Sequence, residues 1–233
     1  MRRTILLGTL ILAILSSAAH AVFQPAPAVE RDGRFGSGAD DFSGDIAFDA
    51  LGNSYHMVST DGTFPGETSA GGRDVVVRKN DPAGNELWTT QIGSSGTDNY
   101  GMTMAVTPSG ISAIVGNTTA AFPGFTFLGG FYDAFVAIFD ADGNEIAVDQ
   151  FGTPSWDEAF GVYTDGTKFW VTGFTDGTFP GETSAGGRDG FVRVYGLDGT
   201  LLDSTQFGTS GSDSPSDVAV DAAGNVYVTG FTG

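Results

Sequence analysis

The chain has 233 residues, with 28 acidic and 10 basic side chains, a formal net charge of −18 and no cysteine. The absence of cysteine excludes disulfides, a thiolate zinc site and a cysteine nucleophile. The acidic balance argues against nucleic acid as a partner, because binding to phosphates requires clusters of Lys and Arg. The same balance is typical of a highly soluble protein and of one that meets divalent cations.

The first 21 residues have the pattern of a secretory signal peptide. Arg2 and Arg3 form a positive start, residues 5–15 are apolar, and residues 16–21 are small with an Ala-x-Ala end. The apolar run is too short to span a bilayer, so we expect cleavage and no stable membrane insertion afterwards. The predicted location is secreted, periplasmic or at the cell surface. Removing Arg2 and Arg3 leaves 8 basic against 28 acidic residues, a net charge of −20.

Residues 22–33 are predicted to be an extended lead-in, and residues 34–233 to form a repeat domain. Four units open with Arg-Phe-Gly or Gln-(Phe/Ile)-Gly, at positions 34, 91, 150 and 206, so the repeats are 56–59 residues long. An aspartate follows each opening at a fixed offset: Asp41, Asp98, Asp157 and Asp213. Such a period is a signature of a repeat architecture.

Within each unit, short runs of alternating apolar residues are separated by turn sequences. Runs such as 46–48, 114–116, 133–139, 169–174, 189–195 and 226–231 predict β-strands. Turns such as 49–53, 81–85, 140–144, 197–199 and 221–225 contain the Gly and Asn that tight hairpins require. The predicted fold is all-β, a β-propeller-like array of four-stranded antiparallel blades with about three and a half repeats.

Two regions resemble a known family of repeats. Residues 206–232, with their Gln-Phe-Gly-Thr opening and Asp-Ala-Ala-Gly-Asn turn, resemble the bacterial SBBP-type β-propeller repeat. The pattern Gly-Gly-x-x-Asp-Ala-Phe-Val at residues 129–136 is similar to the same family. The resemblance implies an exported propeller, often in secreted or cell-surface proteins, and it brings no catalytic residues with it.

The number of half-units departs from that pattern. Four first halves are followed by only three second halves. The chain is therefore expected to be a fragment, to form an open arc of blades, or to be completed by a second chain. Unpaired sheet edges in such an array predict self-association.

The longest loops supply the first candidate ligand-binding residues. Residues 60–74 recur without a change as residues 175–189, and Phe-Pro-Gly occurs in three loops. Glu67, Thr68, Glu182 and Thr183 are the loop residues expected to face a ligand. The alternative interpretation is structural: the Phe fills the gap between blades, Pro-Gly makes a turn, and the following Asp caps a strand.

A second candidate is calcium, the one cofactor that the sequence suggests. Asp140, Asp142 and Asn144 place oxygen ligands at alternate positions, as at the start of a calcium loop. The distant bidentate glutamate of such a loop is missing, so the competing interpretation is an ordinary hairpin turn.

The remaining candidates concern aromatic stacking and catalysis. Trp156 lies in a predicted turn and is the best candidate for an exposed aromatic contact, for example with a sugar, and the alternative for this residue is packing in the core. His56 lies in a predicted strand without a supporting triad motif. We therefore expect a non-catalytic module that binds a protein or glycan outside the cell. The alternatives are a carbohydrate-active enzyme with paired acidic residues and a structural fragment of a larger surface protein.

Overall fold

The computed structural model describes residues 35–95 and 99–233. The predicted signal peptide, the lead-in and Asp98 lie outside the described residues. The described part is built from strands, turns and loops, and it contains no helix long and apolar enough to cross a membrane.

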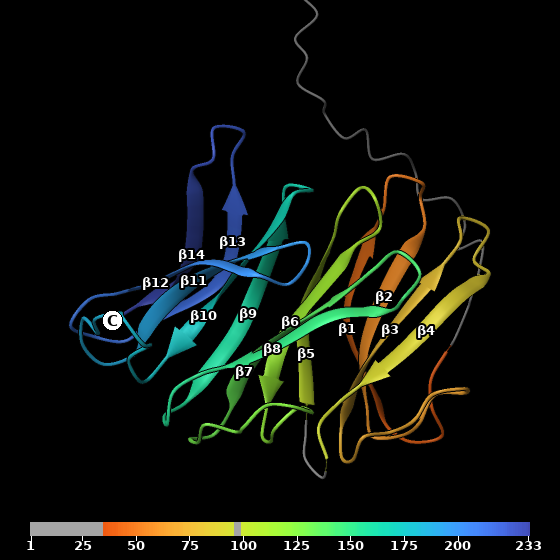
Figure 1. The fold of residues 1–233 in the computed structure, drawn as a ribbon, viewed down its shortest axis with the longest axis horizontal. Helices are drawn as coiled ribbons and strands as arrows, with labels where there is room; N and C mark the ends of the chain where they lie inside the picture. Colours follow the sequence, from red (N-terminus) through yellow and green to blue (C-terminus); the bar gives the residue numbers. More distant parts are fainter. Residues whose placement is uncertain (1–34, 96–98) are drawn as a thin grey trace, which may run out of the picture. The chain divides into compact units, whose positions relative to one another are not determined.

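Three antiparallel sheets of four strands follow one another along the chain (Figure 1). Blade 1 contains β1 (Asp41–Phe48), β2 (Ser54–Thr60), β3 (Asp74–Asn80) and β4 (Glu86–Ile92). Blade 2 contains β5 (Asn99–Val106), β6 (Ser112–Thr118), β7 (Asp133–Phe139) and β8 (Glu145–Phe151). Blade 3 contains β9 (Asp157–Thr164), β10 (Lys168–Thr175), β11 (Asp189–Gly196) and β12 (Leu201–Phe207).

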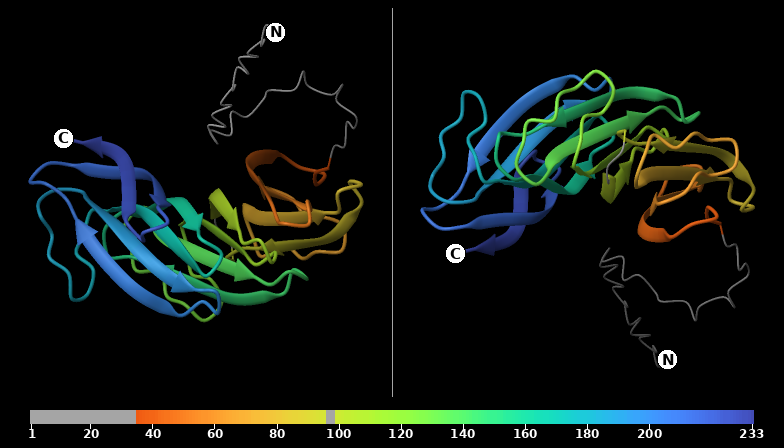
Figure 2. Two further views of the ribbon diagram at one scale, coloured as in Figure 1. Left: turned by 90° about the horizontal axis from the view of Figure 1, so that it is seen from above. Right: turned by 90° about the horizontal axis from the view of Figure 1, so that it is seen from below.

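A two-stranded sheet completes the array. It consists of β13 (Asp213–Val220) and β14 (Val226–Thr232), and β13 contacts β9, β10 and β11 of blade 3 (Figure 2). Three blades and one half-blade confirm the predicted all-β, propeller-like array of about three and a half repeats.

In blades 1 and 3 and in the half-blade, the aspartate that follows each unit opening at a fixed offset has one structural place. Asp41, Asp157 and Asp213 begin their strands and pair with the last threonine of the next strand. In blade 2, however, Asn99 takes this place opposite Thr118. The fixed spacing had pointed to Asp98, so blade 2 has one additional residue before its first strand.

The turns at the upper end of the blades in Figure 1 are short. Turns 49–53, 81–85, 140–144 and 221–225 are each closed by their own aspartate, and the turn after β5 is closed by Thr107. In the turn after β1, Asp49 accepts a hydrogen bond from the Asn53 backbone N–H at 2.9 Å, while Gly52 adopts a φ of 82°. Glycine tolerates this left-handed conformation because it has no Cβ. The long loops, residues 61–73, 119–132 and 176–188, lie at the opposite end of the blades.

The hydrophobic core lies between adjacent blades. One cluster combines residues of blades 1 and 2, and the other combines residues of blades 2 and 3. The loop phenylalanines Phe64, Phe122 and Phe179 are at most 3% exposed. Sequential blades therefore stabilise one another by burying apolar surface, as expected for a repeat protein.

Candidate functional site

The two identical loop segments fold in the same way. In each, an arginine near the end of the loop pairs with an aspartate near its start, Arg73 with Asp61 and Arg188 with Asp176, both at 2.7 Å. These pairs close the loop on itself. The shared ion pair accounts for the recurrence of the Asp and the Arg in the two segments.

A glutamine at the end of each fourth strand fixes the loop to its blade. Gln91 accepts a hydrogen bond from the Phe64 N–H at 2.9 Å and donates to the Gly62 carbonyl and to Asp74. Gln150 and Gln206 make the corresponding bonds to Phe122 and Asp133, and to Phe179 and Asp189. The recurring Phe, Gly and Asp of the loops are thus scaffold, as the structural interpretation predicted.

A cluster of aromatic side chains at the loop end of blades 2 and 3 is not part of the repeated contacts that hold each loop to its blade. This loop-end cluster consists of Phe131, Tyr132, Trp156, Phe174 and Arg188. The Trp156 ring lies 5.4 Å from that of Phe131 and 5.7 Å from that of Phe174, centroid to centroid. The Arg188 guanidinium stands 3.6 Å above the Phe174 ring. Phe131 is 70% exposed, Tyr132, Trp156 and Arg188 are half-buried, and Phe174 is buried, so the cluster presents mainly the Phe131 ring to solvent.

Hydrogen bonds from buried polar side chains fix the position of Trp156 in this cluster. Glu158 accepts a hydrogen bond from the Trp156 indole N–H and another from the Asn117 side chain at 3.3 Å. Burial raises the pKa of Glu158, because the charged carboxylate is poorly solvated there. Asn117 also accepts a bond from the Ala159 N–H at 2.9 Å. The orientation of Trp156 is therefore fixed before any ligand arrives, which lowers the entropic cost of binding.

The predicted loop residues are distributed over separate blades. Glu67 is half-buried and accepts a hydrogen bond from the Gln91 N–H at 2.9 Å, so its carboxylate has a role within blade 1. Glu182 is half-buried, whereas Thr68 and Thr183 are exposed. The structure does not bring the two pairs together, since blade 2 separates blades 1 and 3. Their role in ligand binding stays a prediction.

The proposed calcium ligands form a hydrogen-bonded turn. Asp140 accepts bonds from the backbone N–H groups of Asp142 and Asn144 and from the Asn144 side chain, each at 2.9 Å. The hydrogen bonds from Asn144 lower the pKa of Asp140. Among the described residues there is no group of three or more His, Asp or Glu side chains suited to a metal ion. Calcium binding at this turn remains a prediction for direct titration.

Two arrangements bear on catalysis. The His56 ring lies 3.0 Å from Ser54 Oγ, but burial and the nearby Arg78 lower the pKa of His56, and no described carboxylate contacts the ring. The carboxylates of Asp133 and Asp157 approach each other beside Gly152, yet both residues are fully buried. A substrate therefore cannot reach this acidic pair.

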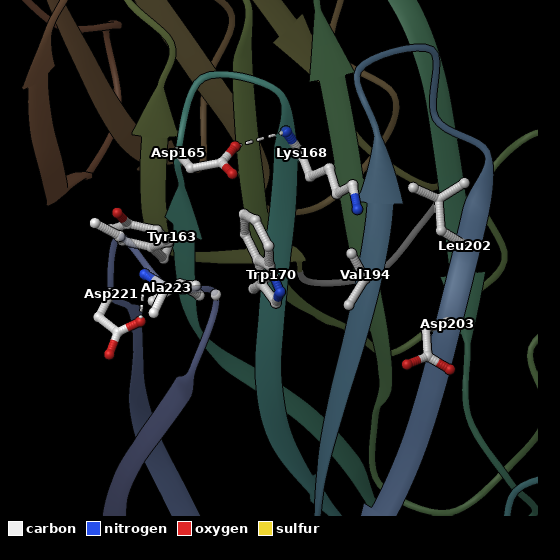
Figure 3. Close-up of a pocket in the computed structure, with 12 residues that line it drawn as sticks. Tyr163, Asp165, Lys168, Trp170, Val194, Leu202, Asp203, Asp221 and Ala223 are labelled. Carbon is white, nitrogen blue, oxygen red and sulfur yellow. Dashed lines mark hydrogen bonds between the residues drawn. The ribbon is translucent and has the colours of Figure 1, made fainter.

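A groove lies at the turn end of blade 3 (Figure 3). This groove, of about 920 Å³, is lined by residues of blade 3 and by the turn between β13 and β14. The Trp170 ring lies 5.9 Å from that of Tyr163. Asp221, which accepts a bond from the Ala223 N–H, borders the same groove.

Sequence reasoning selected Trp156 as a candidate but did not select the residues that surround it in the structure. The signal was present in the middle loop, where Gly129-Gly130 is followed by Phe131-Tyr132, whereas the other two loops have a single arginine there. This departure from the repeat marks the place where the loop end gains an exposed aromatic surface. Residues that differ between otherwise similar repeats are therefore candidates for a role specific to one blade.

The fold and the repeated blade junctions define a β-propeller-type repeat protein. A family model described as the SBBP β-propeller repeat matches residues 204–233. The chain is 27% identical over 196 residues to the regulatory protein FlaEY of Caulobacter vibrioides, covering 75% of this chain and 20% of that protein. The chain thus spans only a small part of this relative.

Solved structures provide a weaker comparison. Two mutants of the Synechocystis apocarotenoid oxygenase align with TM-scores of 0.44 and 0.42 and identities of 10% and 9%. These alignments cover 85% and 82% of this chain and 52% and 50% of the oxygenase chains.

Proposed function

We propose that the chain is an exported, non-catalytic binding module that acts at the cell surface or outside the cell. Its loop-end cluster is the surface that contacts a protein or glycan. The predicted secretory signal supports export, and the burial of Asp133 and Asp157 removes this pair from the candidates for glycan cleavage. The relative named a regulatory protein is consistent with a protein partner.

The observation that carries this proposal is the exposed Phe131 ring packed against the half-buried Trp156. Contiguous apolar surface of this kind often marks an interaction site. Trp and Arg are also the residues that most often dominate binding energy at interfaces. The Arg188 guanidinium, held by Asp176, adds a fixed donor group beside the aromatic rings.

The test is a binding screen of the chain on arrays of glycans and peptides. Probes that bind the wild-type chain are then measured with Phe131→Ala and Trp156→Ala. We expect a loss of at least about tenfold in affinity for each, equivalent to 1.4 kcal/mol. Leu51→Ala is the matched control, because Leu51 is 79% exposed and lies at the turn end. Unchanged binding by Phe131→Ala, or an equal loss with Leu51→Ala, would refute the assignment.

A further inference from the structure

An arginine of the third strand has the same surroundings in blade 1 and in blade 3. In blade 1, the Arg78 guanidinium lies 4.6 Å from the centroid of the Phe35 ring and 5.5 Å from that of the Phe64 ring. Arg78 also donates from Nε to Thr89 Oγ1 at 2.9 Å and pairs with Glu86 at 3.4 Å. Two aromatic rings, a hydroxyl and a carboxylate thus hold one guanidinium in this blade.

Blade 3 repeats this arrangement at its junction with blade 2. The Arg193 guanidinium lies 4.0 Å from the centroid of the Phe151 ring and 5.1 Å from that of the Phe179 ring. It also pairs with Asp149 of blade 2 at 3.3 Å. Phe151 comes from the opening of a repeat unit and Phe179 from a long loop, as do the two rings around Arg78. A guanidinium between two phenyl rings is therefore part of the repeat.

Blade 2 lacks both the guanidinium and one of the rings. Ala137 of β7 pairs with Val148 of β8, in the register in which Arg78 of blade 1 pairs with its own partner in β4. Ala137 therefore holds the place of the arginine. Ile92 holds the place of the opening phenylalanine, because this unit begins with Gln-Ile-Gly where the others have Phe. The repeated contact is thus missing at one junction, the one between blades 1 and 2.

A cavity of about 300 Å³ lies at this junction. Its lining includes Ile92, the loop phenylalanine Phe122, Val148 and Glu145. Phe125 also lines it, at a loop position that carries glutamate in the other two long loops. The volume is at the lower limit for ligand pockets, and most of the lining residues are apolar, which is typical of a site for a small organic molecule.

Glu145 gives this cavity a carboxylate without a matching cation. It begins β8 as Glu86 begins β4, so it is the counterpart of the glutamate that pairs with Arg78. Within the described residues, no Lys, Arg or His side chain lies at ion-pair distance from Glu145. The cavity therefore retains a ring and a carboxylate of the kind that hold a guanidinium in blade 1, but it lacks the guanidinium itself.

We propose that this cavity binds a small guanidinium compound from solution. The planar cation stacks on the Phe122 ring, and its N–H groups donate to the Glu145 carboxylate. Ile92, Val148 and Phe125 contact the apolar stem of the compound. Guanidinium matches a carboxylate in shape and stacks on aromatic rings, which distinguishes it from a simple ammonium ion. The net charge of −18 adds a general attraction for cations.

The cavity is separate from the loop-end cluster, with which it shares no residue. An arginine side chain of a partner protein has the same chemistry as the proposed ligand. We assign the cavity to a free compound, because blades 1 and 2 alone supply the ring, the carboxylate and the apolar walls, and because its volume holds a whole small molecule.

The test titrates the full chain with N-ethylguanidinium and follows the methyl NMR signals of Ile92 and Val148. We expect saturable shifts of these signals, and an affinity at least about tenfold lower for Glu145→Gln, because a charge-assisted hydrogen bond is lost. Glu86→Gln is the matched control and should leave the affinity unchanged, since Glu86 already pairs with Arg78. N-Ethylurea, a neutral molecule of the same shape, should bind at least about tenfold more weakly.

Ala137→Arg tests whether the ligand takes the place of the missing side chain. The new arginine is expected to occupy the cavity, as in blades 1 and 3, and to abolish the shifts. If this buried substitution prevents folding, Glu145→Gln decides the test, because Glu145 is exposed.

An absence of saturable shifts, equal affinities for N-ethylguanidinium and N-ethylurea, or an equal loss with Glu86→Gln would overturn the proposal. Binding of an acetylated Gly-Arg-Gly amide without binding of N-ethylguanidinium would also overturn it, by assigning the cavity to an arginine of a partner protein.

Discussion

The glutamine at the end of each fourth strand illustrates how single residues join the loops to the blades. Gln91 is 8% exposed and uses its side-chain oxygen and nitrogen for two hydrogen bonds to the first long loop and one to Asp74 at the start of β3. Buried polar groups left without a partner are costly. One polar side chain therefore fixes the position of a loop that is otherwise rich in flexible glycine.

This role predicts the effect of Gln91→Ala. The substitution leaves the Phe64 N–H and the Gly62 carbonyl without the Gln91 side chain and removes one of the donors to Asp74, so we expect a loss of about 1–3 kcal/mol in the free energy of unfolding. Urea denaturation measures this loss. Thr68→Ala, in the same loop but exposed, is the control and should have little effect. A loss for Gln91→Ala no larger than for the control would contradict the structural role.

Asp157 predicts a dependence of stability on pH. Burial raises its pKa from 3.8 to about 6, so between these values the folded state binds more protons than the unfolded state. Stability contributed by this group is therefore expected to fall as pH rises from about 4 to about 6. Asp157→Asn should remove that part of the dependence, and the position tolerates an amide because Asn99 holds it in blade 2. Thermal unfolding of both proteins from pH 4 to 7 tests this, and parallel pH profiles would be inconsistent with it.

At the scale of elements, the hairpin turns show the clearest agreement between sequence and structure. Gly and Asn in 49–53, 81–85, 140–144 and 221–225 predicted tight turns, and each is closed by its own aspartate. Local chemistry is sufficient there because the bonds form within five residues. The first strand of blade 2 was less predictable, since only pairing with Thr118 reveals that Asn99 begins it.

Gly143 and Gly224 occupy equivalent turn positions, so Ala substitutions at the two sites distinguish the cost of backbone strain from the cost of lost packing between blades. Gly143 and Gly224 both have a φ of 85°, but a Cβ on Gly143 would lie 2.6 Å from the Trp88 ring, whereas a Cβ on Gly224 meets nothing within 4 Å. Gly224→Ala should therefore cost only the left-handed strain, about 1–2 kcal/mol. Gly143→Ala should cost clearly more, because it also disturbs the contact between blades 1 and 2. Equal losses in urea denaturation would show that the turn does not pack on Trp88.

At the scale of the whole molecule, repeat length and strand count were enough to predict the blades, because each blade repeats one local pattern. The candidate binding surface was only partly predictable. Trp156 could be selected from its position in a turn, but its contacts with Phe131 and Arg188 join separate segments of the chain. Contacts between loops of different blades are visible only in the folded structure.

The central claim is that the loop-end cluster of blades 2 and 3 is the surface through which the chain binds a partner. The affinity of one array-selected probe for the wild-type chain, for Phe131→Ala and for Leu51→Ala tests it most directly. The account predicts a loss of at least about tenfold for Phe131→Ala and an unchanged affinity for Leu51→Ala. Equal affinities for the three proteins would contradict it.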